Sequence, residues 1–165
     1  MRVPIRKAGE FTRIVPDPYL TVGKFNELNK KLKQLKVLLP QAVSEVKRLA
    51  EMGDFSENAA YQMAKGRLRG LNQHIFDLEE QLKLSIIIKP GHNKNKIQLG
   101  SRATVKMAGR QKTYLILGSS EIDVKNNIIS HNSPIGSALM GKKAGDSVKI
   151  QLAGSEVEFK IIKIV

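Results

Sequence analysis

Two long stretches of the chain place apolar residues three and four positions apart in alternation. In an α-helix this spacing gathers the apolar side chains on one face, which a second helix can cover. The first stretch starts after Thr21, a residue type that often caps helices, and it resumes in phase after Pro40. We therefore expect the proline to kink this helix rather than end it. Its apolar positions are Phe25, Leu28, Leu32, Leu35, Leu39, Ala42, Val46 and Leu49.

The second stretch follows a short bend that contains Gly53. Two helices of similar length joined by a short bend pack against each other as an antiparallel hairpin. Each arm has about 30 residues, so the hairpin should be on the order of 45 Å long. Residues 21–89 are therefore predicted to form a coiled-coil hairpin with the bend at its far end. The apolar positions of the second arm are Tyr61, Ala64, Leu68, Leu71, Ile75, Leu78 and Leu82.

The pattern changes after Lys89, where the polar segment PGHNKNK follows. Strands are predicted in RATVKM, KTYLIL, EIDV and NIIS, and residues 146–165 predict a β-hairpin around AGS. Ser133, Pro134 and Gly141 are residue types that begin and close a short helix. The predicted fold class is α+β: the helical hairpin is followed, over residues 90–165, by a small antiparallel β-sheet domain with one short helix.

The chain is strongly basic, with 28 Lys and Arg against 15 Asp and Glu and a net charge of +13. This balance favours a polyanionic partner such as nucleic acid or a nucleoprotein complex. There is no cysteine, so disulfides and thiolate metal sites are excluded, and no apolar run is long enough to cross a membrane. Residues 1–20 lack the apolar core of a signal peptide, and their prolines predict an extended basic tail.

The bend GDFSEN carries two acids, Asp54 and Glu57, three residues apart in this basic chain. Their spacing fits a capping box at the start of the second helix, and this structural interpretation remains open. A metal-binding role is favoured by Glu57, which continues the apolar seam ahead of Tyr61. An acid is tolerated at a seam position only where the seam opens to water, which is the tip of the hairpin.

Three cations, Lys65, Arg67 and Arg69, follow the bend by roughly two to three helical turns. Because a helix advances about 100° per residue, Lys65 and Arg69 are neighbours on one face, whereas Arg67 points elsewhere. The plain alternative is an ordinary solvated helix surface. Together with the acidic bend, however, the basic shaft predicts a probe for a site that holds metal ions and nucleic acid.

The stretch GDFSENAAYQMAKGRLRGLNQHIFDLEEQL resembles the hairpin-tip signature of the bacterial GreA/GreB transcript cleavage factors, usually G-D-L-x-E-N-A-E-Y. The entry LTVGKFNELNKKLKQLK resembles their opening T-x-x-G-x-x-K-L. Their C-terminal signature resembles VKNNIISHNSPIGSALMGKKAGDSVKI and the ending VEFKIIKIV. The resemblance covers about Leu20 to Val165. Phe55 replaces the usual Leu, and Ala60 replaces the usual Glu before the Tyr, which lowers the charge of the tip.

The resemblance implies a transcription elongation factor whose hairpin enters the secondary channel of a backtracked RNA polymerase. An FKBP-like C-terminal domain is implied to dock on the polymerase rim. Asp54 and Glu57 match the tip acids that support Mg²⁺ jointly with the polymerase, which itself cleaves the nascent RNA 3′ end. Asn58 and Tyr61 match the flanking pattern. The implied protein is a cytoplasmic, monomeric non-enzyme without a stably bound cofactor.

Under this interpretation Lys65 and Arg69 are candidates for contact with phosphates of the RNA 3′ segment. Two other functions are weighed against it. A Gre-like inhibitor would block the same channel, but such relatives carry extra tip acids and this bend has few. A peptidyl-prolyl isomerase would need an aromatic-lined pocket. The second domain has no Trp, and its only Tyr and Phe are Tyr114 and Phe159.

Overall fold

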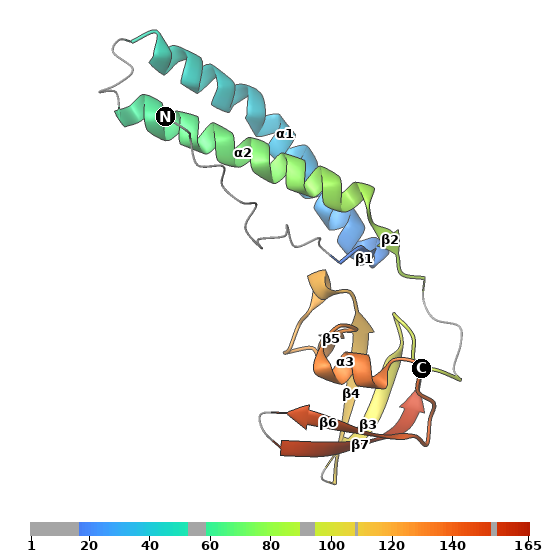
Figure 1. Ribbon diagram of the computed structural model, residues 1–165. Helices are drawn as coiled ribbons and strands as arrows, with labels where there is room; N and C mark the ends of the chain where they lie inside the picture. Colours follow the sequence, from blue (N-terminus) through green and yellow to red (C-terminus); the bar gives the residue numbers. More distant parts are fainter. Residues whose placement is uncertain (1–16, 53–58, 90–94, 108, 153–154) are drawn as a thin grey trace, which may run out of the picture.

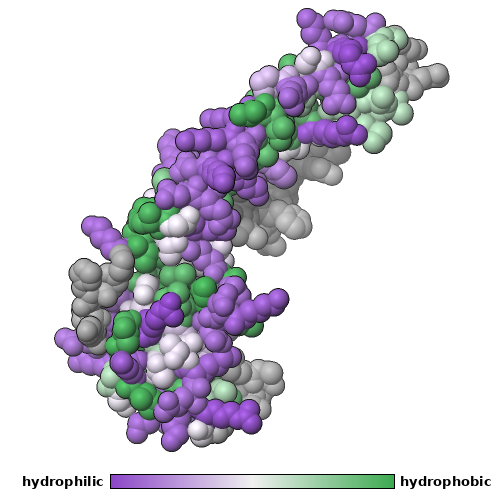
Figure 2. Space-filling model, turned by 180° about the vertical axis from the view of Figure 1, so that it is seen from behind, coloured by the Kyte–Doolittle hydropathy of each residue, from purple (hydrophilic) through white to green (hydrophobic). Residues whose placement is uncertain are grey.

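The computed structural model describes residues 17–52, 59–89, 95–107, 109–152 and 155–165. It consists of a long helical hairpin that projects from a small β-sheet domain (Figure 1). On the face seen in Figure 2, hydrophilic residues predominate along the hairpin and are interrupted by hydrophobic patches. The predicted order of a hairpin followed by an α+β sheet domain is confirmed.

Helix α1, Val22–Ala50, begins where the sequence predicts. The hydroxyl oxygen of Thr21 accepts a hydrogen bond from the Lys24 backbone N–H at 3.2 Å, which satisfies a donor that the first turn leaves free. The helix continues through Pro40, so the proline does not end it. With 29 residues, α1 is about 43 Å long.

Helix α2, Ala59–Lys83, returns antiparallel to α1 (Figure 1). Every predicted seam position of both helices is buried or half-buried, while most of the remaining positions are exposed. The heptad pattern therefore predicted the helix–helix interface correctly. Its most deeply buried members are Leu28, Ala64, Ile75 and Leu78.

A two-stranded parallel sheet, which the sequence did not predict, closes the base of the hairpin. Strand β1, Tyr19–Leu20, pairs with β2, Ile86–Ile87. Leu20 is fully buried and packs with Leu28 and Leu78 of the hairpin. These first described residues belong to the range that the sequence assigned to an extended tail, yet they pack into the hairpin base.

The second domain contains a five-stranded sheet with the order β5-β4-β3-β7-β6. The predicted C-terminal hairpin is present as two long antiparallel strands, β6 and β7. The register of β3 and β7 shifts between Thr104 and Val105, which marks a β-bulge. The strands are β3, Arg102–Met107; β4, Arg110–Leu117; β5, Ile128–Ser130; β6, Ser147–Leu152; and β7, Ser155–Ile164.

Two details of the predicted sheet are wrong. The sheet is mixed, because β4 and β5 run parallel, and the predicted strand EIDV is absent. A 3₁₀ turn, Ser119–Glu121, follows β4 instead. The Asp123 carboxylate then accepts hydrogen bonds from the backbone N–H groups of Lys125 and Asn126. This turn chemistry overrides the strand propensity of Ile and Val, and the chain re-enters the sheet alongside β4.

Helix α3, Pro134–Leu139, covers one face of the sheet (Figure 1). Its predicted signals are confirmed: the Ser133 hydroxyl accepts from the Gly136 N–H at 3.0 Å, and Gly141 has a φ of 76°. Leu139 packs fully buried in the core beneath the helix. The buried core consists of Ile97, Ala103, Val105, Tyr114, Ile116, Leu139, Val148, Ile150, Phe159, Ile161 and Ile164.

Candidate functional site

The predicted tip residues Asp54, Glu57 and Asn58 lie outside the described residues. The two helix ends that their segment connects are described: α1 ends at Ala50 and α2 begins at Ala59. Both ends lie at the extreme of the hairpin farthest from the sheet domain (Figure 1). The acid-bearing segment therefore joins the helices at the end of a rod about 40 Å long.

The first turns of α2 present Tyr61 and Lys65 together. Tyr61 is half-buried at the seam, and Lys65 is exposed one turn further on. The Lys65 Nζ lies 5.7 Å from the centroid of the Tyr61 ring, within the range of a cation–π contact. At an exposed site such a contact is worth about 0.5–1 kcal/mol, so it orients the lysine without removing its charge from solvent.

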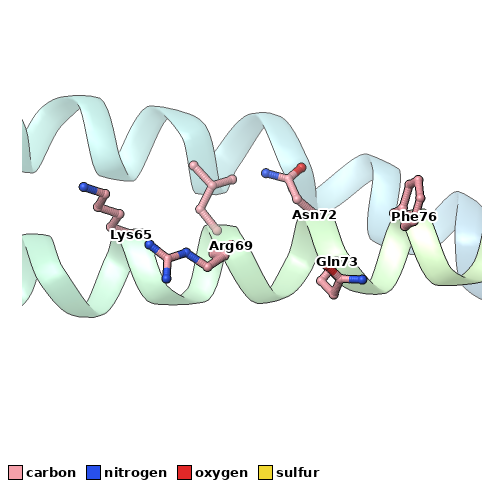
Figure 3. A pocket seen from close by; sticks show the side chains of 6 residues that line it. Lys65, Arg69, Asn72, Gln73 and Phe76 are labelled. Carbon is pink, nitrogen blue, oxygen red and sulfur yellow. The ribbon is translucent and has the colours of Figure 1, made fainter. Parts of the chain in front are cut away.

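Lys65 and Arg69 line one groove along the hairpin, as their spacing predicted. The two long side chains extend along α2 toward the end that leads to the tip (Figure 3). Helical side chains point back toward the N-terminus of their helix, which explains this direction. The groove has a volume of about 590 Å³. Its lining residues are Lys65, Leu68, Arg69, Asn72, Gln73 and Phe76.

Arg67 lies outside this groove and has a different partner. Its guanidinium is 3.5 Å from the Glu45 carboxylate of α1, an ion pair that bridges the two helices at the surface. The structure thus brings two of the three predicted cations together and sets the third apart. The charges of Lys65 and Arg69 have no carboxylate within 4.0 Å among the described residues.

Sequence reasoning missed the half of the groove that lies away from the tip. Asn72, Gln73 and Phe76 continue the helical face of Arg69 at spacings of three, four and seven residues. Phe76 is 46% exposed, so the groove has a basic end and an apolar end. The same i, i+3, i+4, i+7 spacing that identified the seams contained this signal.

A second feature that the sequence did not reveal is a polar joint between hairpin and sheet domain. Asp17 accepts hydrogen bonds from the Ser119 N–H at 2.7 Å and from the Ser119 hydroxyl at 2.8 Å. Burial alone would raise the pKa of the Asp17 carboxyl. The hydrogen bonds from Ser119 and Tyr19, together with the nearby His131, instead hold that pKa below its ordinary value.

His131 completes this side of the joint. Its Nδ1 lies 3.4 Å from the Asp17 Oδ2, close enough for an ion pair when protonated but without the alignment of a hydrogen bond. Its ring meets the Tyr19 ring edge-on, with centroids 5.4 Å apart. Local sequence patterns cannot indicate this contact, because Asp17 lies more than 100 positions before His131 along the chain.

Two further contacts tie helix ends to the 3₁₀ turn. The Glu121 carboxylate accepts from both the N–H and the hydroxyl of Thr21, each at 2.6 Å, and Gln81 donates to Ser120 at 3.2 Å. Thr21 is thus both the cap of α1 and an anchor on the sheet domain. Such charge-assisted bonds are short and directional, so the joint sets the direction in which the rod projects.

Glycine is required where the joint is tightest. A Cβ atom built at Gly118 would lie 2.0 Å from the backbone oxygen of Tyr19. No real carbon approaches an oxygen so closely, so any side chain here would push β1 away from the sheet domain. The backbones of the two domains therefore contact each other directly at this point.

The sheet domain has an apolar groove of its own, with a volume of about 260 Å³. It lies beside β4, β5 and the start of α3. Ile122 and Val124 at its rim are 53% and 80% exposed. The apolar members of its lining are Tyr114, Ile122, Val124, Ile128, Ile129, Pro134 and Ile135.

Neither a metal cluster nor a membrane span occurs in the part of the chain that the structure describes. No group of three or more His, Cys, Asp or Glu side chains there is placed to hold a metal ion. None of the described helices combines the length and apolarity needed to span a bilayer. Asp54 and Glu57 do not belong to the described residues.

Sequence comparison matches two family models. Residues 18–87 match "Transcription elongation factor, N-terminal", and residues 92–165 match "Transcription elongation factor, GreA/GreB, C-term". The chain is 36% identical over 149 residues to the transcription elongation factor GreA of Macrococcus caseolyticus, covering 88% of this chain and 94% of the relative. It is also 36% identical over 150 residues to GreA of Neisseria meningitidis, covering 88% and 95%.

Among solved structures, the chain is similar to GreA factor homolog 1 (Gfh1) of Thermus thermophilus. That match has a TM-score of 0.41 and 24% identity, and covers 89% of this chain and 97% of the other. A GreA/GreB elongation factor from Nitrosomonas europaea matches with a TM-score of 0.40 and 20% identity, covering 63% and 92%. The two family models, which together cover most of the chain, and the curated relatives, each matching 88% of it, establish that it belongs to the GreA/GreB family of transcription elongation factors.

Proposed function

We propose that the chain enters the secondary channel of a backtracked RNA polymerase with its hairpin tip and stimulates cleavage of the nascent RNA 3′ end. The polymerase active site carries out the hydrolysis, and this chain supplies ligands and position. Removal of the extruded 3′ segment lets an arrested complex resume elongation. The protein acts as a monomer in the cytoplasm, where a bacterial polymerase works.

The observation that carries this proposal is the reach of the hairpin. Helices of 29 and 25 residues extend the chain from its sheet domain, and the segment with Asp54 and Glu57 joins their far ends. A rod of about 40 Å suits delivery of a short acidic segment into a deep, narrow channel. An enzyme with its own active site would instead gather such acids in a pocket.

The chemistry of the tip fits a shared site. Carboxylate oxygens are the ligands that Mg²⁺ prefers, and the ion, when bound, lowers the pKa of the attacking water and offsets charge on the phosphodiester. Asp54 and Glu57 supply two such ligands, too few to hold Mg²⁺ alone. They complete a coordination sphere that polymerase carboxylates begin. Asn58 and Tyr61, which match the flanking pattern of the tip signature, are the candidates for supporting these acids.

The basic end of the hairpin groove extends this role to the RNA. Lys65 and Arg69 lie in one groove that leads to the tip, and neither has a carboxylate within 4.0 Å among the described residues. Phosphate groups of the extruded 3′ segment are suitable partners for both. Arg67 pairs with Glu45 and is expected to contribute less. The contact should weaken with salt, as phosphate contacts do.

The sheet domain provides the docking surface on the polymerase rim. Its exposed apolar groove beside β4, β5 and α3 supports this role, because exposed Ile122 and Val124 gain by being covered. The joint keeps the hairpin in one direction relative to that surface. Docking and insertion are thereby coupled through the bonds that Asp17 and Thr21 make.

Stalled, backtracked elongation complexes from the same organism test the proposal. The wild-type chain should shorten the transcript from its 3′ end, and incubation with RNA and Mg²⁺ without polymerase should leave the RNA intact. Asp54→Ala and Glu57→Ala should abolish cleavage while polymerase binding persists. If both acids are only helix caps, each variant should lose about 0.5–2 kcal/mol of stability and keep its activity per folded molecule.

The inhibitor alternative has its own signature in the same assay. Elongation would slow without a shortened transcript, and the tip variants would relieve the block. Such a result would contradict stimulated cleavage while leaving entry into the secondary channel intact.

A further inference from the structure

The sheet domain has one face that no described helix covers. Helix α3 and the core occupy the other face (Figure 1). Because side chains alternate along a strand, β3 turns Ala103 and Val105 into the core and presents Arg102 and Lys106 on the open face. Both cations are exposed.

Strand β7 adds two more cations beside them. Phe159 and Ile161 face the core, whereas Lys160 and Lys163 are exposed. In the register of the sheet, Lys160 lies opposite Lys106, and Lys163 lies opposite Thr104. The bulge between these pairs adds one residue to β7, which is why two lysines three positions apart share the open face.

This arrangement opposes the stability of the sheet. Like charges directly opposite each other on neighbouring strands repel, so the Lys106–Lys160 pair destabilises the fold. No carboxylate among the described residues lies within 4.0 Å of Arg102, Lys106, Lys160 or Lys163. Lys149 on β6 is by contrast paired with Glu156 at 3.3 Å. Besides Glu156, the described acid on this face is Glu158.

The chemistry of the face indicates the kind of polyanion. Tyr114 and Phe159 both belong to the core, so the described open face has no aromatic ring on which an unpaired base can stack. Thr104 and Thr113 bond to each other through their hydroxyls at 2.9 Å, which links β3 to β4 between Arg102 and Lys106. A face with cations and no stacking ring suits the phosphate backbone of a duplex better than a single strand, because proteins that bind single strands stack the bases on aromatic side chains.

We infer that the open face of the sheet, defined by Arg102, Lys106, Lys160 and Lys163, binds the phosphate backbone of double-stranded DNA without sequence preference. The site lies on the sheet domain and is separate from the hairpin groove. It neither requires nor follows from transcript cleavage. The inference rests on charge complementarity and on the Lys106–Lys160 pair, which has no described carboxylate within 4.0 Å.

A matched pair of double variants tests it. Lys106→Gln with Lys160→Gln removes two charges from the face, and Lys31→Gln with Lys47→Gln removes two charges from exposed positions of α1. Binding of the intact chain to a fluorescent duplex of about 20 base pairs is measured by anisotropy between about 50 and 200 mM salt. The face variant should lose roughly tenfold in affinity for each lost contact at about 0.1 M salt. The slope of the logarithm of its affinity against the logarithm of the salt concentration should become shallower by about 1.8. The control should retain the wild-type slope.

One charge reversal separates binding from folding. Lys106→Glu places opposite charges across the strands, so it should raise the melting temperature while it weakens DNA binding. Equal losses in the two double variants, or a face variant with wild-type affinity, would overturn the inference. So would failure of the wild-type chain to bind duplex DNA while it binds polyglutamate, which would assign the face to an acidic protein instead.

Discussion

The hairpin and the sheet domain differ in how much apolar surface they bury. The sheet domain gathers eleven buried side chains into one core between the sheet and α3. The hairpin covers only one stripe of each helix, and few of its side chains fall below a tenth of their free exposure. A rod gains length at the expense of burial, because side chains on its outer faces have nothing to pack against. The sheet domain thus provides the stable anchor, and the hairpin provides the reach.

Polar contacts at the joint connect the hairpin to the sheet domain. Asp17, Thr21 and Gln81 on the hairpin side bond to the turn at Ser119–Glu121. Hydrogen bonds fix direction more sharply than apolar burial does, since they depend on angle as well as distance. The rod can therefore be thin and still project in a defined direction from its anchor.

The largest expected effect contrasts the two interiors. Phe159→Ala should cost about 3–5 kcal/mol, because it removes a ring that is 1% exposed from the closed core. Leu35→Ala in the half-buried seam should cost less than about 2 kcal/mol. Hydrogen exchange at individual amides measures both, and losses should concentrate in β3 and β7 for the first variant and in α1 and α2 for the second. Equal costs would contradict the contrast.

A smaller effect is expected where the two backbones touch. Gly118→Ala places a methyl group against the Tyr19 carbonyl and should destabilise the joint by about 1–3 kcal/mol. Calorimetry should then resolve separate melting of hairpin and sheet domain. Gly23→Ala is the control, since its Cβ would meet only the Thr21 hydroxyl at an ordinary 3.8 Å. A single unchanged transition in Gly118→Ala would show that the backbones can separate without cost.

The joint should also respond to acid. The folded-state pKa of Asp17 lies below its ordinary value of 3.8, so its ionised form stabilises the protein above that pH. Asp17→Asn should therefore cost about 1–2 kcal/mol at neutral pH. The difference between wild type and variant should shrink as the pH falls below about 4 and through the folded pKa. Urea unfolding across pH measures it, and a difference that persists at low pH would exclude the carboxylate as its source.

The smallest effect sharpens the picture of the rod. Gly66 and Gly70 lie inside α2, and a Cβ atom added at either position would meet no neighbouring side chain or packed segment within 4 Å. Gly66→Ala and Gly70→Ala should each stabilise the hairpin by about 0.5–1 kcal/mol, because glycine is a poor helix former. Thermal unfolding measures the gain. If transcript cleavage falls while stability rises, the glycines serve close approach of another surface to α2.

Much of the architecture was predictable because it depends on local patterns. The heptad seams, the Thr21 and Ser133 caps and the C-terminal β-hairpin were all readable from residue types at fixed spacings. The grouping of Lys65 with Arg69, and the separation of Arg67, also followed from helical geometry. The missing strand at EIDV shows the limit, since the Asp123 carboxylate accepts from the Lys125 backbone N–H and from the Asn126 side chain and forms a turn instead.

The sequence by itself determined the two helices, the face on which they meet and the family signature at their tip, because these depend on residues close together in the chain. Only the tertiary structure decided how hairpin and sheet domain join. Asp17 meets Ser119 and His131, and Thr21 meets Glu121, across about 100 positions of sequence. It also decided that Lys106 faces Lys160, because strand register and a bulge place them opposite each other. Pairings of this kind have no local period, so they emerge only when the whole chain packs.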